Sequence, residues 1–383
     1  MNVSGDWLTN APTQAVCKML TDAGYQALFV GGCVRNALLG APVNDIDLST
    51  DAAPDAVVQL AKQAGLKAVP TGIEHGTVTV IASHTPHEIT TFRRDVATDG
   101  RRAVVAFSTD VADDARRRDF TMNALYARPD GSVIDPLGGL PDLLARRVRF
   151  IEDANQRLRE DYLRALRFFR FHAWYGDAEQ GLDADALAAI AANLDGLAQL
   201  SKERVTAEFE KLLCAPDPAP ALAAMQHSGV LLACLGGGDI RTLGPLLQLE
   251  TQMDLPLDPI LRLAALGDVD VDTRLRLSKE DARFFHLFRA EAQDLAPPQV
   301  LAYRHDSLTA ERIIALRAAL LESPVPDGYQ EQIERGARAR FPVTARDLMP
   351  GYQGPELGLK LKELEARWIK ADFAPTREDL LKG

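Results

Sequence analysis

Gly31-Gly32-Cys33-Val34-Arg35-Asn36, with Asn44-Asp45-Ile46-Asp47-Leu48 shortly downstream, is the stretch that decides the fold. The residues before it, 25–30, are mostly apolar and predict a strand. Glycines that directly follow a strand let backbone N–H groups approach a phosphate without interference from side chains. We therefore interpret Gly31 and Gly32 as a turn that binds a triphosphate.

The two aspartates of this stretch are separated by one residue. On extended backbone, Asp45 and Asp47 would point to the same side, because side-chain direction repeats every two residues. Mg²⁺ takes one or two carboxylates and completes its shell with water and substrate phosphates. The pattern predicts a magnesium site beside the phosphate turn, and the reaction class that fits is metal-assisted nucleotidyl transfer.

Two alternatives remain open at this stage: a dinucleotide-binding turn, and charges at the end of a solvated strand. Neither Gly-x-Gly-x-x-Gly nor Gly-Lys-Ser/Thr follows the predicted strand, which weakens both a dinucleotide site and a Walker loop.

Composition indicates a globular protein of two or three domains, since 383 residues are 46% hydrophobic and 25% charged. No apolar run reaches the ~18 residues of a membrane span, and the first residues lack the order of a secretory signal. We expect a soluble, cytoplasmic protein with no membrane contact. The cysteines show no Cys-x-x-Cys pairing, so the sequence suggests neither a zinc cluster nor a disulfide framework.

A net charge of −11 argues against a protein that coats nucleic acid through a broadly basic surface. Arginines nevertheless gather at 93–102, 116–118 and 146–170. Such clusters suit one phosphate-bearing ligand held in a cleft, although solvated faces are the alternative.

The secondary-structure pattern changes near residue 150. Before it, strand-like runs at 27–30, 77–82, 88–92 and 104–107 alternate with helical stretches such as 54–65, which predicts a mixed or mainly antiparallel sheet. After Phe150, apolar residues recur only at helical spacing. The fold class is therefore α+β, with a helical remainder.

A second segment, residues 117–126, combines arginine, carboxylate, amide and hydroxyl groups. Arg118 can pair with phosphate through its planar fork, Asp119 can accept from ribose hydroxyls, and Asn123 can do either. The alternative is that Arg118 and Asp119 cap and cross-link a helix N-terminus.

A third segment, residues 159–171, predicts an arginine-bearing amphipathic helix that includes Arg167. Asp161 and Arg164 would stand one turn apart on one face. Asp161 could accept from the exocyclic amine of cytosine or adenine while Arg164 donates to the ring nitrogen, whereas uracil and guanine would mispair with both. A solvated ion pair is the alternative.

Taken in order, these motifs resemble the class II tRNA nucleotidyltransferase and bacterial poly(A) polymerase superfamily, whose best-known members are CCA-adding enzymes. The resemblance covers nearly the whole chain. It rests on the Gly-Gly-x-Val-Arg turn with Asp45-x-Asp47, the block 117–121, Asp135-Pro136-x-Gly138-Gly139, the Glu160-Asp161-x-x-Arg164 segment, and residues 201–213.

The resemblance implies a palm-like nucleotidyltransferase head (1–148), a helical neck that selects the nucleotide (149–215), and a helical body and tail that hold the tRNA acceptor arm (216–383). It implies template-independent addition of CCA to tRNA from CTP and ATP with release of pyrophosphate. Bacterial poly(A) polymerase activity is the alternative. Residues 93–119, with Asp99-Gly100-Arg101, resemble the mobile loop with which the family switches from C to A.

The resemblance also implies residue roles. Asp45, Asp47 and Glu88 would be catalytic, and Asp45 and Asp47 would hold two Mg²⁺ ions; a surface strand glutamate is the alternative for Glu88. Nucleotide would be bound by Gly31, Gly32, Arg35, Arg118, Asp119, Asn123, Asp161, Arg164 and Arg167. Asn36 departs from the family, which generally has Asp there, so a role for this position as metal ligand or base is in doubt. A non-catalytic RNA-binding protein, a further alternative, would be expected to lack a catalytic carboxylate, and this chain keeps both aspartates.

Overall fold

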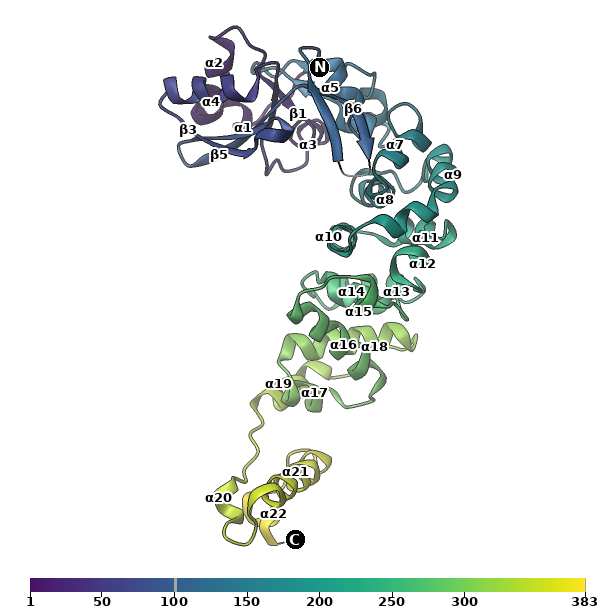
Figure 1. The fold of residues 1–383 in the computed structure, drawn as a ribbon. Coiled ribbons are helices and arrows are strands. Elements are labelled where there is room, and N and C mark those ends of the chain that lie inside the picture. The colour runs from purple at the N-terminus through teal and green to yellow at the C-terminus, as the bar shows by residue number, and fades with distance from the viewer. Residues whose placement is uncertain (100–101, 383) are drawn as a thin grey trace. The chain divides into compact units, whose positions relative to one another are not determined.

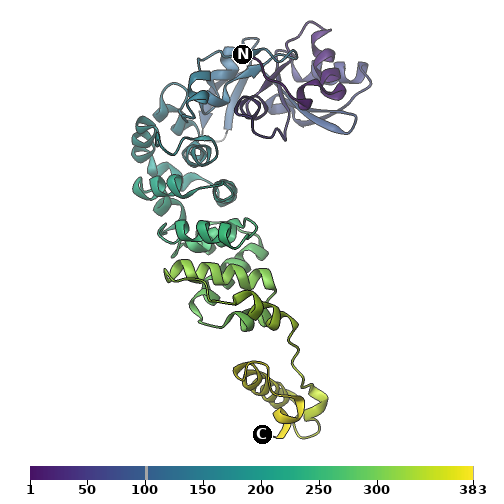
Figure 2. The same ribbon diagram turned by 180° about the vertical axis from the view of Figure 1, so that it is seen from behind.

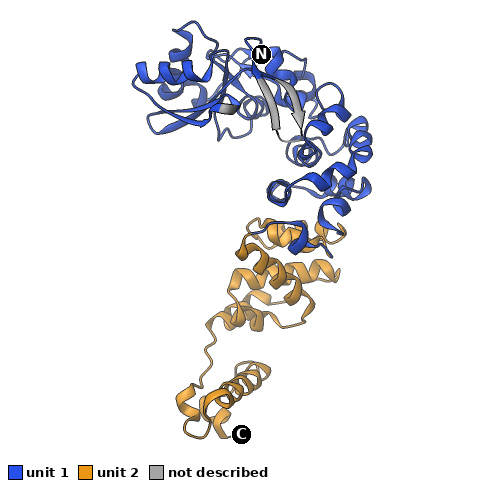
Figure 3. Ribbon diagram, in the orientation of Figure 1, with its two compact units in different colours: residues 1–238, 268–277 blue, residues 239–267, 278–383 orange. Residues whose placement is uncertain are grey.

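The computed structural model describes residues 1–99 and 102–382. The chain divides into two compact units (Figure 3). Unit 1 contains residues 1–238 and 268–277, and unit 2 contains residues 239–267 and 278–383. The first stretch of unit 1 ends at the glycine run 236–238. The finer division into head, neck and body stays a prediction.

A seven-stranded mixed sheet forms the N-terminal part of unit 1, which confirms the predicted fold class. All neighbouring strands are antiparallel except β2 and β5, which run parallel. In spatial order the strands are β3 (Lys67–Gly72), β4 (Thr77–Ala82), β5 (Thr85–Thr91), β2 (Asp47–Thr50), β1 (Leu28–Val30), β8 (Tyr126–Ala127) and β9 (Val133–Ile134).

Helices cover the sheet and start where the sequence supplies caps. Two of them, α2 (Ala11–Thr21) and α4 (Pro54–Gln63), pack on each other and on the strands β3 to β5 (Figure 1). Asn10 caps α2 by accepting from the backbone N–H of Thr13, and Pro54 stands in the first turn of α4. The other helices before residue 150 are α1 (Asp6–Thr9), α3 (Gly32–Leu39), α5 (Val111–Arg116) and α6 (Leu140–Leu144), with the 3₁₀ turns η1 (Ile73–His75) and η2 (Thr121–Asn123).

A separate two-stranded ribbon leaves the sheet after Phe92. It consists of β6 (Arg93–Asp99) and β7 (Arg102–Phe107), which pair antiparallel. The backbone N–H of Phe92 donates to the carbonyl of Thr50, so the start of the ribbon is tied to the end of β2. The predicted switching segment therefore contains a ribbon followed by α5. Gly100 and Arg101 lie outside the described residues.

The rest of unit 1 is helical, as the view from behind shows (Figure 2). Within the described part of the chain, no strand follows β9, as predicted. The helices are α7 (Ala154–Glu160), α8 (Leu163–Tyr175), α9 (Ala184–Ala192), η3 (Leu194–Gln199), α10 (Lys202–Leu213), α11 (Ala219–His227), α12 (Val230–Leu235) and α15 (Val271–Arg274).

Phenylalanines join α8 to the sheet domain. The ring of Phe120 lies 5.1 Å from those of Phe150 and Phe171, and Phe150 stacks on Phe168 at 5.7 Å. Such aromatic pairs each contribute about 0.5–1.5 kcal/mol beyond area burial. The cluster fixes α8 against residues 118–123.

The single helix predicted over residues 159–171 is wrong at Asp161. The chain is extended there, with φ −158° and ψ 105°, so α7 ends at Glu160 and α8 begins at Leu163. The Asp161 carboxylate accepts from the backbone N–H of Leu163, an interaction that competes with helix continuation. Asp161 and Arg164 therefore do not share one helix face.

Unit 2 is helical throughout its described residues. Its helices are α13 (Leu243–Gln252), α14 (Pro259–Ala265), α16 (Lys279–Gln293), α17 (Pro298–Arg304), α18 (Ser307–Leu320), α19 (Tyr329–Arg338), α20 (Ala345–Leu348), α21 (Gly354–Lys370) and α22 (Arg377–Lys382). Trp368 anchors an aromatic cluster with Tyr303, Phe341 and Phe373. Among residues 1–99 and 102–382, no helix has the length and apolarity needed to cross a membrane.

Candidate nucleotide-binding site

A cavity of about 410 Å³ in unit 1 gathers the motifs that are distant in the sequence. Its lining includes all nine predicted nucleotide-binding residues: Gly31, Gly32, Arg35, Arg118, Asp119, Asn123, Asp161, Arg164 and Arg167. Asp47, Arg117, Leu163, Phe171 and Arg204 complete the lining. Six arginines face three aspartates there, so the cavity suits an anionic ligand despite the acidic net charge of the chain.

The glycine turn connects β1 to the N-terminus of α3. Gly31 has φ 68° and ψ −117°, a backbone conformation that disfavours other residues. A Cβ atom at Gly31 would lie 3.5 Å from Nη1 of Arg118, so the absence of a side chain leaves this nitrogen accessible. The N-terminus of α3 and the Arg118 guanidinium thus converge on one spot, an arrangement that favours phosphate.

Three carboxylates lie around the start of β2. Asp47 is its first residue and pairs in register with Glu88 on the parallel strand β5, while Asp45 precedes the strand and is exposed. Burial, and then the charge of Glu88, raise the pKa of Asp47 to about 6; Arg118 opposes this and Asp45 adds to it. Mutually repelling carboxylates of this kind fit a divalent cation, which would relieve the repulsion.

The sequence predicts two metal ligands, Asp45 and Asp47. Within the described ranges, no group of three or more His, Cys, Asp or Glu side chains is arranged to hold a metal ion. Asp45 and Glu88 are also missing from the residues that line the cavity. Two protein carboxylates plus ligand phosphates and water remain compatible with Mg²⁺, and the roles of Asp45 and Glu88 stay predictions.

A hydrogen-bonded network joins the second motif to α8. Asp119, 7% exposed, accepts from Nδ2 of Asn123 (3.0 Å) and from Nε of Arg167 (2.7 Å). Burial would raise the pKa of Asp119, but the charge of Arg167 and these hydrogen bonds lower it to about 2. Arg35 donates to Oδ1 of Asn123 and to the hydroxyl of Tyr175. These residues therefore fix the relation between the turn and α8 as well as lining the cavity.

The predicted base-reading residues have partners that the sequence did not indicate. Asp161 accepts from Nη2 of Arg204 at 2.6 Å, rather than pairing with Arg164. Arg164 instead pairs with Glu160 at 2.6 Å and donates to the backbone carbonyls of Arg157 and Arg117. Both side chains still line the same cavity, and each is held by a separate partner.

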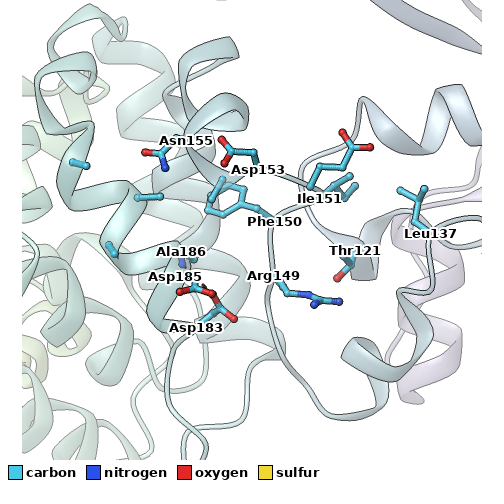
Figure 4. Close-up of a pocket in the computed structure, with 15 residues that line it drawn as sticks. Thr121, Leu137, Arg149, Phe150, Ile151, Asp153, Asn155, Asp183, Asp185 and Ala186 are labelled. Carbon is cyan, nitrogen blue, oxygen red and sulfur yellow. Dashed lines mark hydrogen bonds between the residues drawn. The ribbon is translucent and has the colours of Figure 1, made fainter.

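A larger cavity, of about 750 Å³, lies elsewhere in unit 1 (Figure 4). Its lining contains Asp153 and Asp183, whose carboxylates cap the N-termini of α7 and α9. None of the residues predicted to bind nucleotide or metal lines it. The acidic rim and the engaged caps make it a poor phosphate site.

Two residues that shape the 410 Å³ cavity, Arg204 and Asp114, were not identified as site residues from the sequence. Arg204 belongs to a quoted motif, but its ion pair with Asp161 spans 43 residues and has no local signal. Asp114 holds Arg117 and Arg118, and its spacing of three and four residues before them on a helical segment could have revealed it.

Two family models match this chain. A family model described as the poly A polymerase head domain matches residues 27–149. A second, described as a probable RNA and SrmB-binding site of polymerase A, matches residues 181–235.

Curated relatives and solved structures give more specific likenesses. The CCA tRNA nucleotidyltransferase 1, mitochondrial, of Danio rerio is 32% identical over 93% of this chain and 86% of its own length. The CCA-adding enzyme of Geobacillus thermodenitrificans is 41% identical over 56% of this chain and 52% of its own length. The crystal structure of the Bacillus stearothermophilus CCA-adding enzyme in complex with CTP matches with a TM-score of 0.75 at 29% identity, covering 95% of this chain and 94% of that one.

Proposed function

This chain belongs to the family of CCA-adding tRNA nucleotidyltransferases, and from that premise we propose that it adds C, C and A to the 3′ end of tRNA. CTP and ATP would donate CMP and AMP, with release of pyrophosphate. The observation that carries the proposal is the single cavity in which the glycine turn, Asp47, Asp161 and Arg164 meet. Because these residues line one cavity, the protein could bind the triphosphate and recognise the base of the same nucleotide without a nucleic-acid template.

Each group of residues that lines the cavity would bind one part of the nucleotide. The α3 N-terminus and Arg118 would bind the triphosphate, and Asp119 with Asn123 the sugar region. Asp161 would accept from the amine of cytosine or adenine, and Arg164 would donate to the adjacent ring nitrogen. Two Mg²⁺ ions held by Asp45 and Asp47 would supply activation of the tRNA 3′-hydroxyl and charge stabilisation at the departing pyrophosphate. The helical residues 216–383 would hold the acceptor arm.

Product analysis tests this proposal and its alternative. Purified protein is incubated with tRNA that lacks its terminus, with CTP, ATP, UTP or GTP separately and with CTP and ATP together, and the products are sequenced. We expect two C residues from CTP alone and a finished CCA from the mixture, after which addition stops. Continued AMP addition to unrelated RNA would instead assign poly(A) polymerase activity. This alternative is tested because the family model that matches residues 27–149 is described as a poly A polymerase head domain.

The raised pKa of Asp47 predicts a pH-dependent response to Mg²⁺. A carboxyl whose pKa is higher in the folded state, here about 6 and well above the usual range of an aspartate, stabilises the metal-free fold at low pH. That contribution is lost as pH rises through about 6. Mg²⁺ binds the deprotonated form, so we expect millimolar Mg²⁺ to raise the melting temperature more at pH 8 than at pH 5.

Thermal unfolding at both pH values, with and without Mg²⁺, measures the shift in melting temperature that Mg²⁺ causes. Buffers that contain EDTA give the metal-free baseline. The Asp47→Asn variant is the control and should show the same small Mg²⁺ response at both pH values. Equal Mg²⁺ shifts at pH 5 and pH 8 in the parent protein would contradict the assignment of Asp47 as a ligand.

Asn36, where the family generally has Asp, holds the loop before Asp45. Its Oδ1 accepts from Nε and Nη2 of Arg35, at 3.2 and 2.9 Å, and its Nδ2 donates to the carbonyl of Pro42 at 2.8 Å. If the Asn36 amide were flipped, its N–H donors would point at the Arg35 guanidinium, which only donates. The neighbours of Asn36 therefore fix which end of the amide is the oxygen.

We expect Asn36→Asp to weaken this loop, because a carboxylate cannot donate to Pro42 and would face its carbonyl oxygen. A lost hydrogen bond of about 1 kcal/mol corresponds to roughly a fivefold rise in the Mg²⁺ concentration that gives half-maximal rate. Steady-state Mg²⁺ titrations measure it, with Asn36→Ala as the variant that also loses the acceptor. An unchanged Mg²⁺ requirement in Asn36→Asp would show that the Pro42 contact is dispensable.

A further inference from the structure

Asp114, on α5, is a fully buried carboxylate that the function described so far does not use. It is 0% exposed, and two arginines that line the cavity converge on it. Nε of Arg117 donates to its Oδ1 at 2.7 Å, and Nη2 of Arg118 donates to its Oδ2 at 2.9 Å. Tyr126 donates its hydroxyl to Oδ2 at 2.8 Å, and Ser49 approaches it at 3.5 Å.

These contacts come from three different parts of the sheet domain. Ser49 lies on β2, two residues after Asp47, and Tyr126 lies on β8. Burial alone would raise the pKa of Asp114, but Arg118 and Arg117 hold it below its usual range, so the carboxylate stays ionised. A buried charge with this many donors is rigidly placed, because each lost partner would leave it uncompensated.

The contacts to Asp114 determine which face of Arg118 is available to a ligand. Nε and Nη2 of Arg118 point to Asp114, with further contacts to Tyr126 and Ser49. Nη1 points the other way, toward Gly31. Among the contacts of residues 1–99 and 102–382, Nη1 has no protein acceptor, which leaves two N–H donors directed at the glycine turn.

We propose that Asp114 is a positioning residue for triphosphate binding, acting through Arg118. The buried carboxylate holds one edge of the guanidinium so that the opposite edge faces the phosphates beside Gly31. Pre-organisation of this kind lowers the entropic cost of binding a flexible ligand. The inference rests on the proposed function, because it assumes that the ligand of this cavity is a nucleoside triphosphate.

Asp114→Asn tests the proposal by removing the charge while keeping the shape. We expect the dissociation constant of Mg²⁺–CTP, measured by titration calorimetry without tRNA, to rise about tenfold, which is about 1.4 kcal/mol. The KM for CTP should rise by a similar factor, with kcat changed by less than about threefold, since the interaction serves binding.

A double-mutant cycle with Arg118→Gln separates positioning from a general structural effect. If Asp114 acts through Arg118, Asp114→Asn should add less than about twofold to the dissociation constant in the Arg118→Gln background. The proposal would be overturned if the two substitutions raised the CTP dissociation constant by independent factors that multiply in the double variant. It would also be overturned if folded Asp114→Asn kept the CTP affinity of the parent.

Arg118→Lys keeps the proposal testable if Asp114→Asn does not fold. A lysine cannot pair with Asp114 and reach the phosphates at once, so its CTP affinity should fall as far as that of Arg118→Gln. Parent-like affinity in Arg118→Lys would overturn the proposal.

Glu250→Gln is the matched control. Glu250 pairs with Arg262 inside unit 2, and both are buried. This variant should lose stability and keep the CTP affinity of the parent, whereas a loss of CTP affinity here would overturn the proposal by tracing the effect to stability. If the parent protein binds CTP but adds nothing to tRNA, the proposed function fails, while the calorimetric cycle still decides the role of Asp114.

Discussion

Asp47→Asn should abolish nucleotide addition while leaving the protein folded. The substitution removes a carboxylate that, we propose, holds the catalytic metal, and metal ions contribute several kcal/mol of charge stabilisation. At 1.36 kcal/mol per factor of ten, the rate constant of CMP addition should fall by at least about 1,000-fold. The measurement is single-turnover addition of CMP to tRNA that lacks its terminus, at saturating CTP and Mg²⁺.

The same variant should be at least as stable as the parent when metal is absent. Burial and the charge of Glu88 raise the pKa of Asp47 to about 6, which means that its ionised form is destabilised in the fold at neutral pH. Removing that charge relieves the repulsion. Asp55→Asn, at an exposed position in the first turn of α4, is the control and should retain full activity. Substantial CMP addition by Asp47→Asn would remove the proposed metal site.

The fold was predictable where local patterns dominate. The alternating strand at 77–82 and the helix that starts at Pro54 were predicted with nearly correct bounds, because periodicity and proline placement are local properties. The break at Asp161 was not predicted. Apolar residues continue at helical spacing across it, whereas the chain is extended at Asp161 and its carboxylate accepts from the backbone of Leu163.

The candidate site was predictable as a set of residues but not as a set of partners. Gly31, Asp119 and Arg164 belong to motifs far apart in the chain, and their meeting in one cavity follows from the strand order and the phenylalanine cluster. The pairs Asp161–Arg204 and Asp119–Arg167 span 43 and 48 residues. Such pairs depend on tertiary packing, so no local pattern identifies them.

Asp161→Asn should weaken the choice of C and A over U. In the structure, Asp161 accepts from Arg204 and from the backbone of Leu163, and its remaining lone pairs can accept from the base amine. An asparagine that keeps the Arg204 contact through Oδ1 places its Nδ2 where Asp161 accepts from Leu163, so the Leu163 contact is lost and the amide N–H groups turn toward the cavity. These match the carbonyl of uracil and oppose the amine of cytosine and adenine.

Hydrogen bonds to charged groups contribute about 1.5–3 kcal/mol, so kcat/KM for CTP and ATP should fall by roughly 10- to 100-fold. The kcat/KM for UTP should rise, because the asparagine N–H can donate to the uracil carbonyl that Asp161 cannot pair with. Competition assays with CTP and UTP on tRNA that lacks its terminus measure the ratio. Asp185→Asn, an exposed acidic position on α9, should leave it unchanged. A parent-like preference for CTP in Asp161→Asn would mean that the ion pair with Arg204 supports the neck rather than reading the base.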